Sequence, residues 1–128
     1  MRTAINAVII EQGKLLILRK KKTWILPGGK PETTDLNDIS CLCREVDEEL
    51  SGTKLQDIIY YKDFSGITPH KGDILISKVY FANIEGKLYS VREGDSILEA
   101  KWTNNFFQYN LSDITSKIIK SLKQDNYL

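Results

Sequence analysis

The chain has 128 residues, is 41% hydrophobic and 27% charged, and balances 18 Lys and Arg against 17 Asp and Glu for a net charge of +1. This length suits one domain with a sizeable core, spanning residues 1–128, and the charge gives no general attraction to nucleic acid or an anionic membrane. No apolar run approaches the roughly 20 residues that span a bilayer, and no signal-peptide pattern is present, so a cytoplasmic protein is expected.

The predicted elements begin with short strands. β-rich runs at residues 5–10 and 15–18 flank a hairpin turn at Gln12-Gly13. A third strand at residues 24–26 ends at Pro27-Gly28-Gly29, because proline and glycine interrupt regular structure.

Residues 35–50 are predicted to form a helix. At about 100° per residue, one apolar stripe should face the core. It comprises Ile39, Leu42, Cys43, Val46 and Leu50. Cys41 falls outside this stripe, on the acidic side of the helix, so Cys43 is the cysteine that we expect in the core.

Further strands are predicted at residues 58–61, 73–82 and 96–102, and a second helix runs from Ser112 to about Leu122 with Ser112 as its N-cap. Both alternating sets of residues 73–82 are largely apolar, so both faces of the sheet should be covered. The order of elements predicts an α/β (α+β) fold, a mixed sheet with helices on its faces.

The first helix carries an unusual concentration of acids in Arg44-Glu45-Val46-Asp47-Glu48-Glu49. Glu45, Glu48 and Glu49 share one stripe, where their carboxylates repel one another, while Asp47 points elsewhere. Arg44 is expected to pair with Glu48 at i, i+4. A hard divalent cation such as Mg²⁺ or Mn²⁺ would remove that repulsion. An acidic face exposed to water is the alternative, and the helix alone does not decide between the two.

Together, the glycine turn and the helix resemble the Nudix box of the MutT-like hydrolases, G-x5-E-x7-R-E-U-x-E-E-x-G-U, in which U is a bulky aliphatic residue. Gly29 matches the first glycine, and residues 44–49 match R-E-U-x-E-E. Asp35 replaces the first glutamate, eight residues rather than seven separate it from Arg44, and Ser51 replaces the later glycine. The extra residue must be absorbed before the helix, which Asp35 is expected to cap.

The resemblance implies a Nudix-like α/β/α sandwich, with a mixed central sheet and helices on both faces. It also implies Mg²⁺-dependent (or Mn²⁺-dependent) hydrolysis of a pyrophosphate bond in a nucleoside diphosphate linked to another moiety. The implied metal ligands are Glu45, Glu48, Glu49 and the carbonyl of Gly28. The implied catalytic residues are Glu48, Glu49, Arg44 and, from a later loop, Glu93.

Several residues outside the acidic helix are candidates for substrate binding. Arg19, Gly29 and Lys30 are expected to contact phosphates, although the basic run 19–22 also suits solubility alone. Asp95 and Glu99 are rivals to Glu93, each of which also suits an exposed surface. Two further alternatives are open: His70 as a ligand or an exposed loop residue, and a base-stacking or core role for the strand aromatics Tyr60, Tyr61, Phe64, Tyr80 and Phe81.

The sequence does not select the substrate. A nucleoside triphosphate, an oxidised nucleotide and an ADP-ribose-like compound remain alternatives, as does a catalytically inactive Nudix-fold module that binds nucleotides or regulates. The expected partner is a small-molecule nucleotide, without nucleic acid or membrane, and the chain is expected to be a monomer or homodimer.

Overall fold

The computed structural model describes residues 2–50, 52–68, 71–86 and 97–128. Within these ranges, no helix is both long and apolar enough to cross a membrane. The elements in chain order are β1 (Arg2–Val8), β2 (Ile10–Glu11), β3 (Lys14–Lys20), β4 (Thr23–Ile25), β5 (Gly28–Gly29), α1 (Asp38–Glu49), β6 (Thr53–Ile67), β7 (Ile74–Gly86), β8 (Ile97–Thr103) and α2 (Asp113–Gln124).

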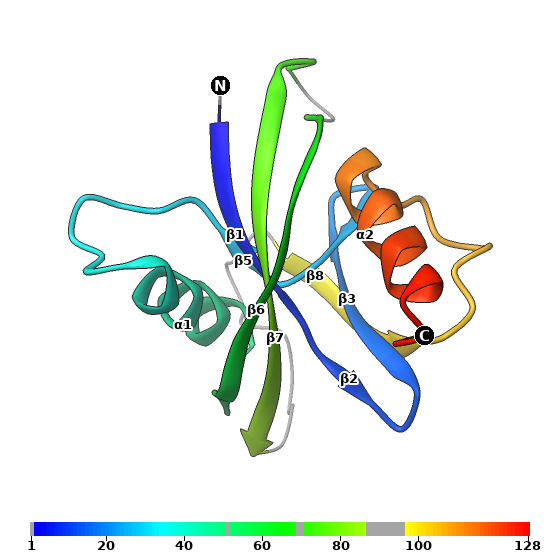
Figure 1. The fold of residues 1–128 in the computed structure, drawn as a ribbon, viewed down its shortest axis with the longest axis horizontal. Coiled ribbons are helices and arrows are strands. Elements are labelled where there is room, and N and C mark those ends of the chain that lie inside the picture. The colour runs from blue at the N-terminus through cyan, green and yellow to red at the C-terminus, as the bar shows by residue number, and fades with distance from the viewer. Residues whose placement is uncertain (1, 51, 69–70, 87–96) are drawn as a thin grey trace.

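The strands form two sheets. The first has the order β5-β1-β7-β6 and is mixed, because β1 runs parallel to β7 while the other pairs are antiparallel. The second is antiparallel, with β3 pairing β2, β4 and β8. Figure 1 shows α1 and α2 on opposite sides of the strands. The expected fold class is confirmed, and the second sheet is a feature that the sequence did not predict.

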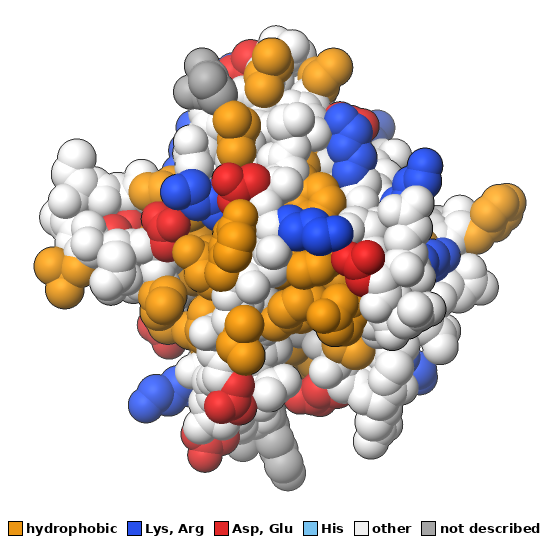
Figure 2. All heavy atoms as spheres, in the orientation of Figure 1, with side chains coloured by type: hydrophobic (Ala, Val, Ile, Leu, Met, Phe, Trp, Pro, Cys, Tyr) orange, Lys and Arg blue, Asp and Glu red, His pale blue; other side chains and the backbone are white. Residues whose placement is uncertain are grey.

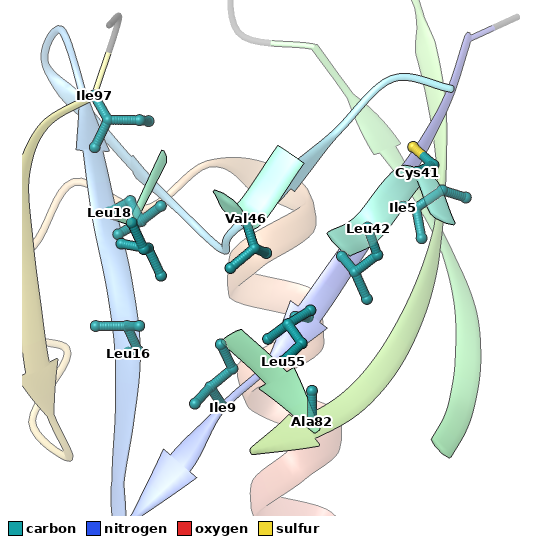
Figure 3. Close-up of a cluster of buried hydrophobic side chains, with 12 residues drawn as sticks. Ile5, Ile9, Leu16, Leu18, Cys41, Leu42, Val46, Leu55, Ala82 and Ile97 are labelled. Atoms are coloured by element: carbon teal, nitrogen blue, oxygen red, sulfur yellow. The ribbon is translucent and has the colours of Figure 1, made fainter. Parts of the chain in front are cut away.

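Strand β1 supplies both layers of the core. Side chains alternate between the two faces of a strand, so neighbouring β1 residues enter different clusters. Ile5 and Ala7 belong to the cluster beneath α1, and Val8 belongs to the cluster beneath α2. Figure 3 shows Ile5 of β1 and Leu42 of α1 in the first cluster, with Leu16 and Leu18 of β3 closing it from the second sheet. The two helices are therefore held by opposite faces of one strand.

The helix boundaries correct one expectation and confirm another. Asn37, rather than Asp35, is the N-cap of α1, because its side chain accepts from the Ser40 N–H at 2.8 Å. In α2, Ser112 is the N-cap as expected and accepts from the Thr115 N–H. The predicted apolar positions of α2 are all buried, namely Ile114, Ile118, Ile119 and Leu122.

The buried stripe of α1 differs from its prediction. Cys41 is fully buried, whereas Cys43 is exposed and Ile39 is 44% exposed. Cys41 lies one turn before Glu45, and its Sγ is 4.0 Å from the Gly29 carbonyl oxygen. Helix α1 therefore turns its acidic side partly inward, against the glycine pair, and this rotation exchanges the expected environments of the two cysteines.

The strand aromatics pack against one another and at the edges of the two cores, with Tyr80 at the cluster beneath α1 and Tyr61, Phe64 and Phe81 at the cluster beneath α2. Tyr61 contacts Phe64, Phe81 and Tyr127, while Tyr60 packs edge-on against Tyr80. Figure 2 shows hydrophobic side chains gathered over β6 and β7, between the two helices. Of the two open roles for these residues, packing is the one that their positions support.

Truncation of Leu42 tests the core beneath α1. Leu42 is fully buried, so Leu42→Ala is expected to lower the free energy of unfolding by about 2–5 kcal/mol. Leu36→Ala is the matched control, because Leu36 is 89% exposed and its loss should cost less than about 0.5 kcal/mol. Urea unfolding of the three proteins measures both effects, and equal losses would contradict the packing of α1.

Candidate active site

The glycine pair is a two-residue strand against β1, with Gly29 opposite Ile5 and Gly28 opposite Asn6. Gly28 has φ +134°, and a Cβ there would collide with the Ile5 carbonyl oxygen. A Cβ at Gly29 would lie 2.5 Å from Glu45 Oε2. Glycine is thus required at Gly28 by the approach to the β1 backbone, whereas at Gly29 it leaves room for the Glu45 carboxylate.

The three glutamates of α1 line one cavity beside this turn. The Gly28 N–H donates to Glu49 Oε1 at 2.8 Å, and Glu49 is only 8% exposed. Glu45 packs against Gly29, and the side chain of Glu48 is 51% exposed to solvent. The cavity has a volume of about 410 Å³ and is lined by Lys20, Ile25, Gly28, Gly29, Lys30, Glu45, Glu48, Glu49 and Ile97.

Arg44 joins the helix to the loop that precedes it. Its Nε and Nη2 both donate to the Asp35 carboxylate at 2.9 Å, a two-pronged pairing that fixes the plane of the guanidinium. Nη1 donates to Glu45 Oε1 at 3.0 Å and lies 3.5 Å from Glu48 Oε1, the expected pair at i, i+4. Nη2 also donates to the Lys30 carbonyl oxygen at 3.1 Å.

The loop before α1 absorbs the extra residue of the box. Asp35 faces Arg44, Asn37 caps the helix, and Leu36 between them is 89% exposed. Asp35, which stands where the motif has its first glutamate, therefore pairs with Arg44 despite the longer spacing.

The charges around Arg44 shift the pKa values of their partners. Hydrogen bonds from the Arg44 guanidinium and from the Glu32 N–H lower the pKa of Asp35 from 3.8 to about 2. The carboxylates of Asp35 and Glu45 in turn raise the pKa of Arg44. Burial raises the pKa of Glu45, even though Arg44 acts in the opposite direction. Glu45 is thus a desolvated carboxylate whose charged form is costly to hold.

The oxygen atoms that the glutamates and the glycine turn offer at this cavity are of the kind that a hard divalent cation binds. Carboxylate and carbonyl oxygens are the ligands that Mg²⁺ prefers, and the three glutamates line one cavity. Within the described ranges, however, no three His, Cys, Asp or Glu side chains converge tightly enough to form a ready-made metal site. Arg44 explains part of this, because it already holds one oxygen of Glu45.

The other predicted residues fall in different places. Lys30 lines the cavity, but Arg19 is bound to Glu99, with Nε 3.1 Å from Oε1, and is absent from the described cavity lining. Lys20, the next residue, lines the cavity instead. The strand pairing of β3 with β8 shifts register between these two basic residues. Three predicted or rival residues lie outside the described ranges, namely His70, Glu93 and Asp95.

A second cavity of about 220 Å³ adjoins the first and extends toward α2. The two share the residues of the turn and its neighbours, and the second has mostly aliphatic walls, including Leu75, Ile114 and Ile118. Asn6 also lines it, a residue that the sequence analysis missed. The available signal was a polar amide within the otherwise apolar run INAVII.

The pairing of Asp35 with Arg44 predicts a specific dependence of stability on pH. Because the pKa of Asp35 is lower in the folded chain, its charged form stabilises the fold above about pH 4. That stabilisation is lost as the pH falls from about 4 toward 2. Asp35→Asn should therefore lower the urea midpoint at pH 6 and have a vanishing effect near pH 2.

Replacement of the exposed Asp47 on α1 by Asn is the control, with no change in the urea midpoint expected at either pH. A difference between the wild type and Asp35→Asn that stays constant from pH 6 to pH 2 would contradict the assigned pairing.

Comparisons with known proteins identify the family and the fold. The sequence profile of the NUDIX domain matches residues 1–105. No curated protein matches the chain in sequence. The fold is similar to that of the MutT NUDIX hydrolase from Burkholderia pseudomallei, with a TM-score of 0.75 and 23% identity over 93% of this chain and 95% of that one.

Two further structures are similar. The E. coli ORF135 protein has a TM-score of 0.71 and 20% identity, over 98% of this chain and 92% of that one. The NUDIX domain of Shewanella oneidensis NrtR, complexed with ADP ribose, has a TM-score of 0.77 and 16% identity, over 98% of this chain and 88% of that one. At these identities the similarity supports the fold, and the profile supports the family. The chain belongs to the NUDIX domain family.

Proposed function

We propose that the chain is a Mg²⁺-dependent pyrophosphohydrolase that cleaves a pyrophosphate bond in a nucleoside diphosphate linked to another moiety. The observation that carries the proposal is the shared cavity of the three glutamates and the glycine turn, with Glu49 bonded to the Gly28 N–H. The family membership supports the same reaction class.

Each residue at the cavity has a proposed role. Glu45, Glu48 and Glu49, with the Gly28 carbonyl, hold Mg²⁺ (or Mn²⁺), and Glu48 or Glu49 accepts the proton of the attacking water. Bound Mg²⁺ supplies charge neutralisation at the phosphates and lowers the pKa of a bound water. Arg44 is a positioning residue, because it contacts Glu45 and Glu48 while the loop acid Asp35 fixes its plane.

Basic side chains give the cavity its selectivity for phosphate. Lys20 and Lys30 line the same cavity as the glutamates, and in this proposal their ammonium groups bind substrate phosphates. Arg19 contributes to substrate binding in this proposal if its pairing with Glu99 opens. Glu93, outside the described ranges, is retained as the proposed additional acid of the site.

The proposed substrate is a small nucleotide. The complex of the Shewanella NUDIX domain with ADP ribose supports a ligand of this class. The second cavity, open toward α2, provides room for a group attached to the diphosphate. We also propose that residues 1–128 act as one domain, because the two cores share strand β1. The proposed oligomeric state is a monomer or a homodimer.

An inactive nucleotide-binding module is the competing function. Its support in the sequence is the longer box spacing, but Asp35 pairs with Arg44 despite that spacing, and the three glutamates line one cavity. The geometry therefore favours catalysis.

Turnover decides between the two functions. The chain is incubated with nucleoside triphosphates, oxidised nucleotides and nucleoside diphosphate sugars, including ADP-ribose, with Mg²⁺ or Mn²⁺, and the products are identified by mass. Hydrolysis of at least one diphosphate compound is expected, with loss of activity in the presence of a chelator. Binding without turnover across the whole panel would overturn the proposal.

Replacement of Glu49 tests the assigned residues. Glu49→Gln should lower kcat by about 10²-fold or more, because it removes a negative oxygen ligand from the metal. Asp47→Asn is the matched control on the same helix, since Asp47 is exposed and absent from the cavity lining. A Glu49→Gln variant as active as the control would remove Glu49 from the site.

The two glycines separate function from stability. The obstacle at Gly29 is the end of the flexible Glu45 side chain, so Gly29→Ala should displace that carboxylate and lower activity at least about tenfold with little loss of stability. The obstacle at Gly28 is β1 backbone, and φ is +134°, so Gly28→Ala should also lower the thermal midpoint by several degrees. Equal thermal midpoints for the two variants would contradict this distinction.

A further inference from the structure

Asn6 lies beneath the glycine turn with its side chain fully engaged. Its Nδ2 donates to the carbonyl oxygens of Leu26 at 3.4 Å and Pro27 at 3.3 Å. Its Oδ1 accepts from the hydroxyl of the fully buried Ser77 at 2.6 Å. Carbonyl oxygens only accept and a hydroxyl can donate, so the chemistry of these partners fixes the orientation of the amide.

The Pro27 carbonyl oxygen receives two donors from successive residues of β1. The backbone N–H of Ala7 donates to it at 2.9 Å, and Asn6 Nδ2 is the second donor. The carbonyl of Pro27 and the N–H of Gly28 belong to one rigid trans peptide plane and point in opposite directions. Donors that hold the carbonyl therefore also set the direction of the Gly28 N–H.

That N–H is the donor to Glu49 Oε1. We propose that Asn6, held by Ser77, is a positioning residue, which orients the peptide plane between Pro27 and Gly28 and so places the Glu49 carboxylate for metal binding. The last step rests on the proposed function, whereas the orientation of the peptide plane does not. A polar amide in the middle of a buried strand, where β-propensity disfavours asparagine, has a purpose on this account.

The first test needs neither metal nor substrate. Asn6→Leu replaces the amide with an apolar group of similar size, and hydrogen exchange at the Gly28 amide is followed by NMR in ¹⁵N-labelled protein. Exchange at Gly28 should accelerate about three- to tenfold relative to the Leu16 amide, which is bonded to the Ile9 carbonyl away from the turn. Ser77→Ala should give a smaller change of the same sign.

Val8→Ala is the matched control, because Val8 is a buried residue on the same face of β1 and belongs to the α2 cluster. It should leave the ratio of the Gly28 and Leu16 exchange rates within about twofold of the wild type. If the ratio of the Gly28 and Leu16 exchange rates in Asn6→Leu equals the ratio in Val8→Ala, the proposal is overturned, whatever the activity of the protein.

The second test follows Mn²⁺ binding to the substrate-free protein by electron paramagnetic resonance. Asn6→Leu should weaken the affinity about tenfold, as residues behind a ligand commonly do, and Val8→Ala should not. Saturating Mg²⁺ should then restore most of kcat. Unchanged Mn²⁺ affinity with an altered KM would mean that Asn6 contacts the substrate directly and would overturn the positioning role.

A wild-type chain that binds no Mn²⁺ and hydrolyses nothing would refute the proposed function instead. The exchange test would still decide whether Asn6 orients the turn, so the two failures are distinguishable.

Discussion

The close approach of the glycine turn to both β1 and α1 is the constraint on which the site depends. Gly28 lies against the backbone of β1, and Gly29 lies against the carboxylate of Glu45. A side chain at either position would separate the strand from the helix or move the carboxylate. The hydrogen bond from the Gly28 N–H to Glu49 then links the turn to the last turn of α1. Strand and helix are joined at the point where the cavity forms.

Electrostatics sets the second constraint. Three glutamates near the C-terminus of α1 oppose the helix dipole, and no basic residue stands in the last turn. Arg44 offsets part of this cost by contacting Glu45 and Glu48, and Asp35 prevents the guanidinium from moving away. Burial nevertheless raises the pKa of Glu45. The cavity thus holds negative charge that a cation would stabilise, as expected for a site whose charge serves binding rather than folding.

Sequence patterns within one helix predicted the features that depend on that helix alone. The spacing of residues 44–49 predicted the pair of Arg44 and Glu48, and helical periodicity predicted α2 and its cap. The burial of Cys41 and the exposure of Cys43 were not predicted, because a helical wheel assumes that the apolar stripe alone faces inward. In the structure, packing against Gly29 also buries part of the acidic side. That packing is a tertiary contact, absent from the helix sequence.

The basic residues show the same limit on a smaller scale. Arg19 was favoured for substrate contact, but the register shift between Arg19 and Lys20 occurs where β3 pairs with β8. A bulge re-aims side chains, and it depends on a pairing strand that the sequence of β3 does not contain. Arg19 finds Glu99 on the neighbouring strand, and Lys20 lines the cavity. Only the pairing partner β8, about 80 residues later in the chain, determines this outcome.

Three violations of local rules meet at one place. An asparagine stands inside a buried strand, a glycine pair forms a strand of its own, and three glutamates crowd the end of a helix. Each is unfavourable for its own element. In the fold, Asn6 bonds to the turn, the turn bonds to Glu49, and Glu45 fills the space above Gly29. Residues that weaken three separate elements bond to or pack against one another at this cavity. This convergence, more than any single motif residue, argues that the cavity was shaped for function.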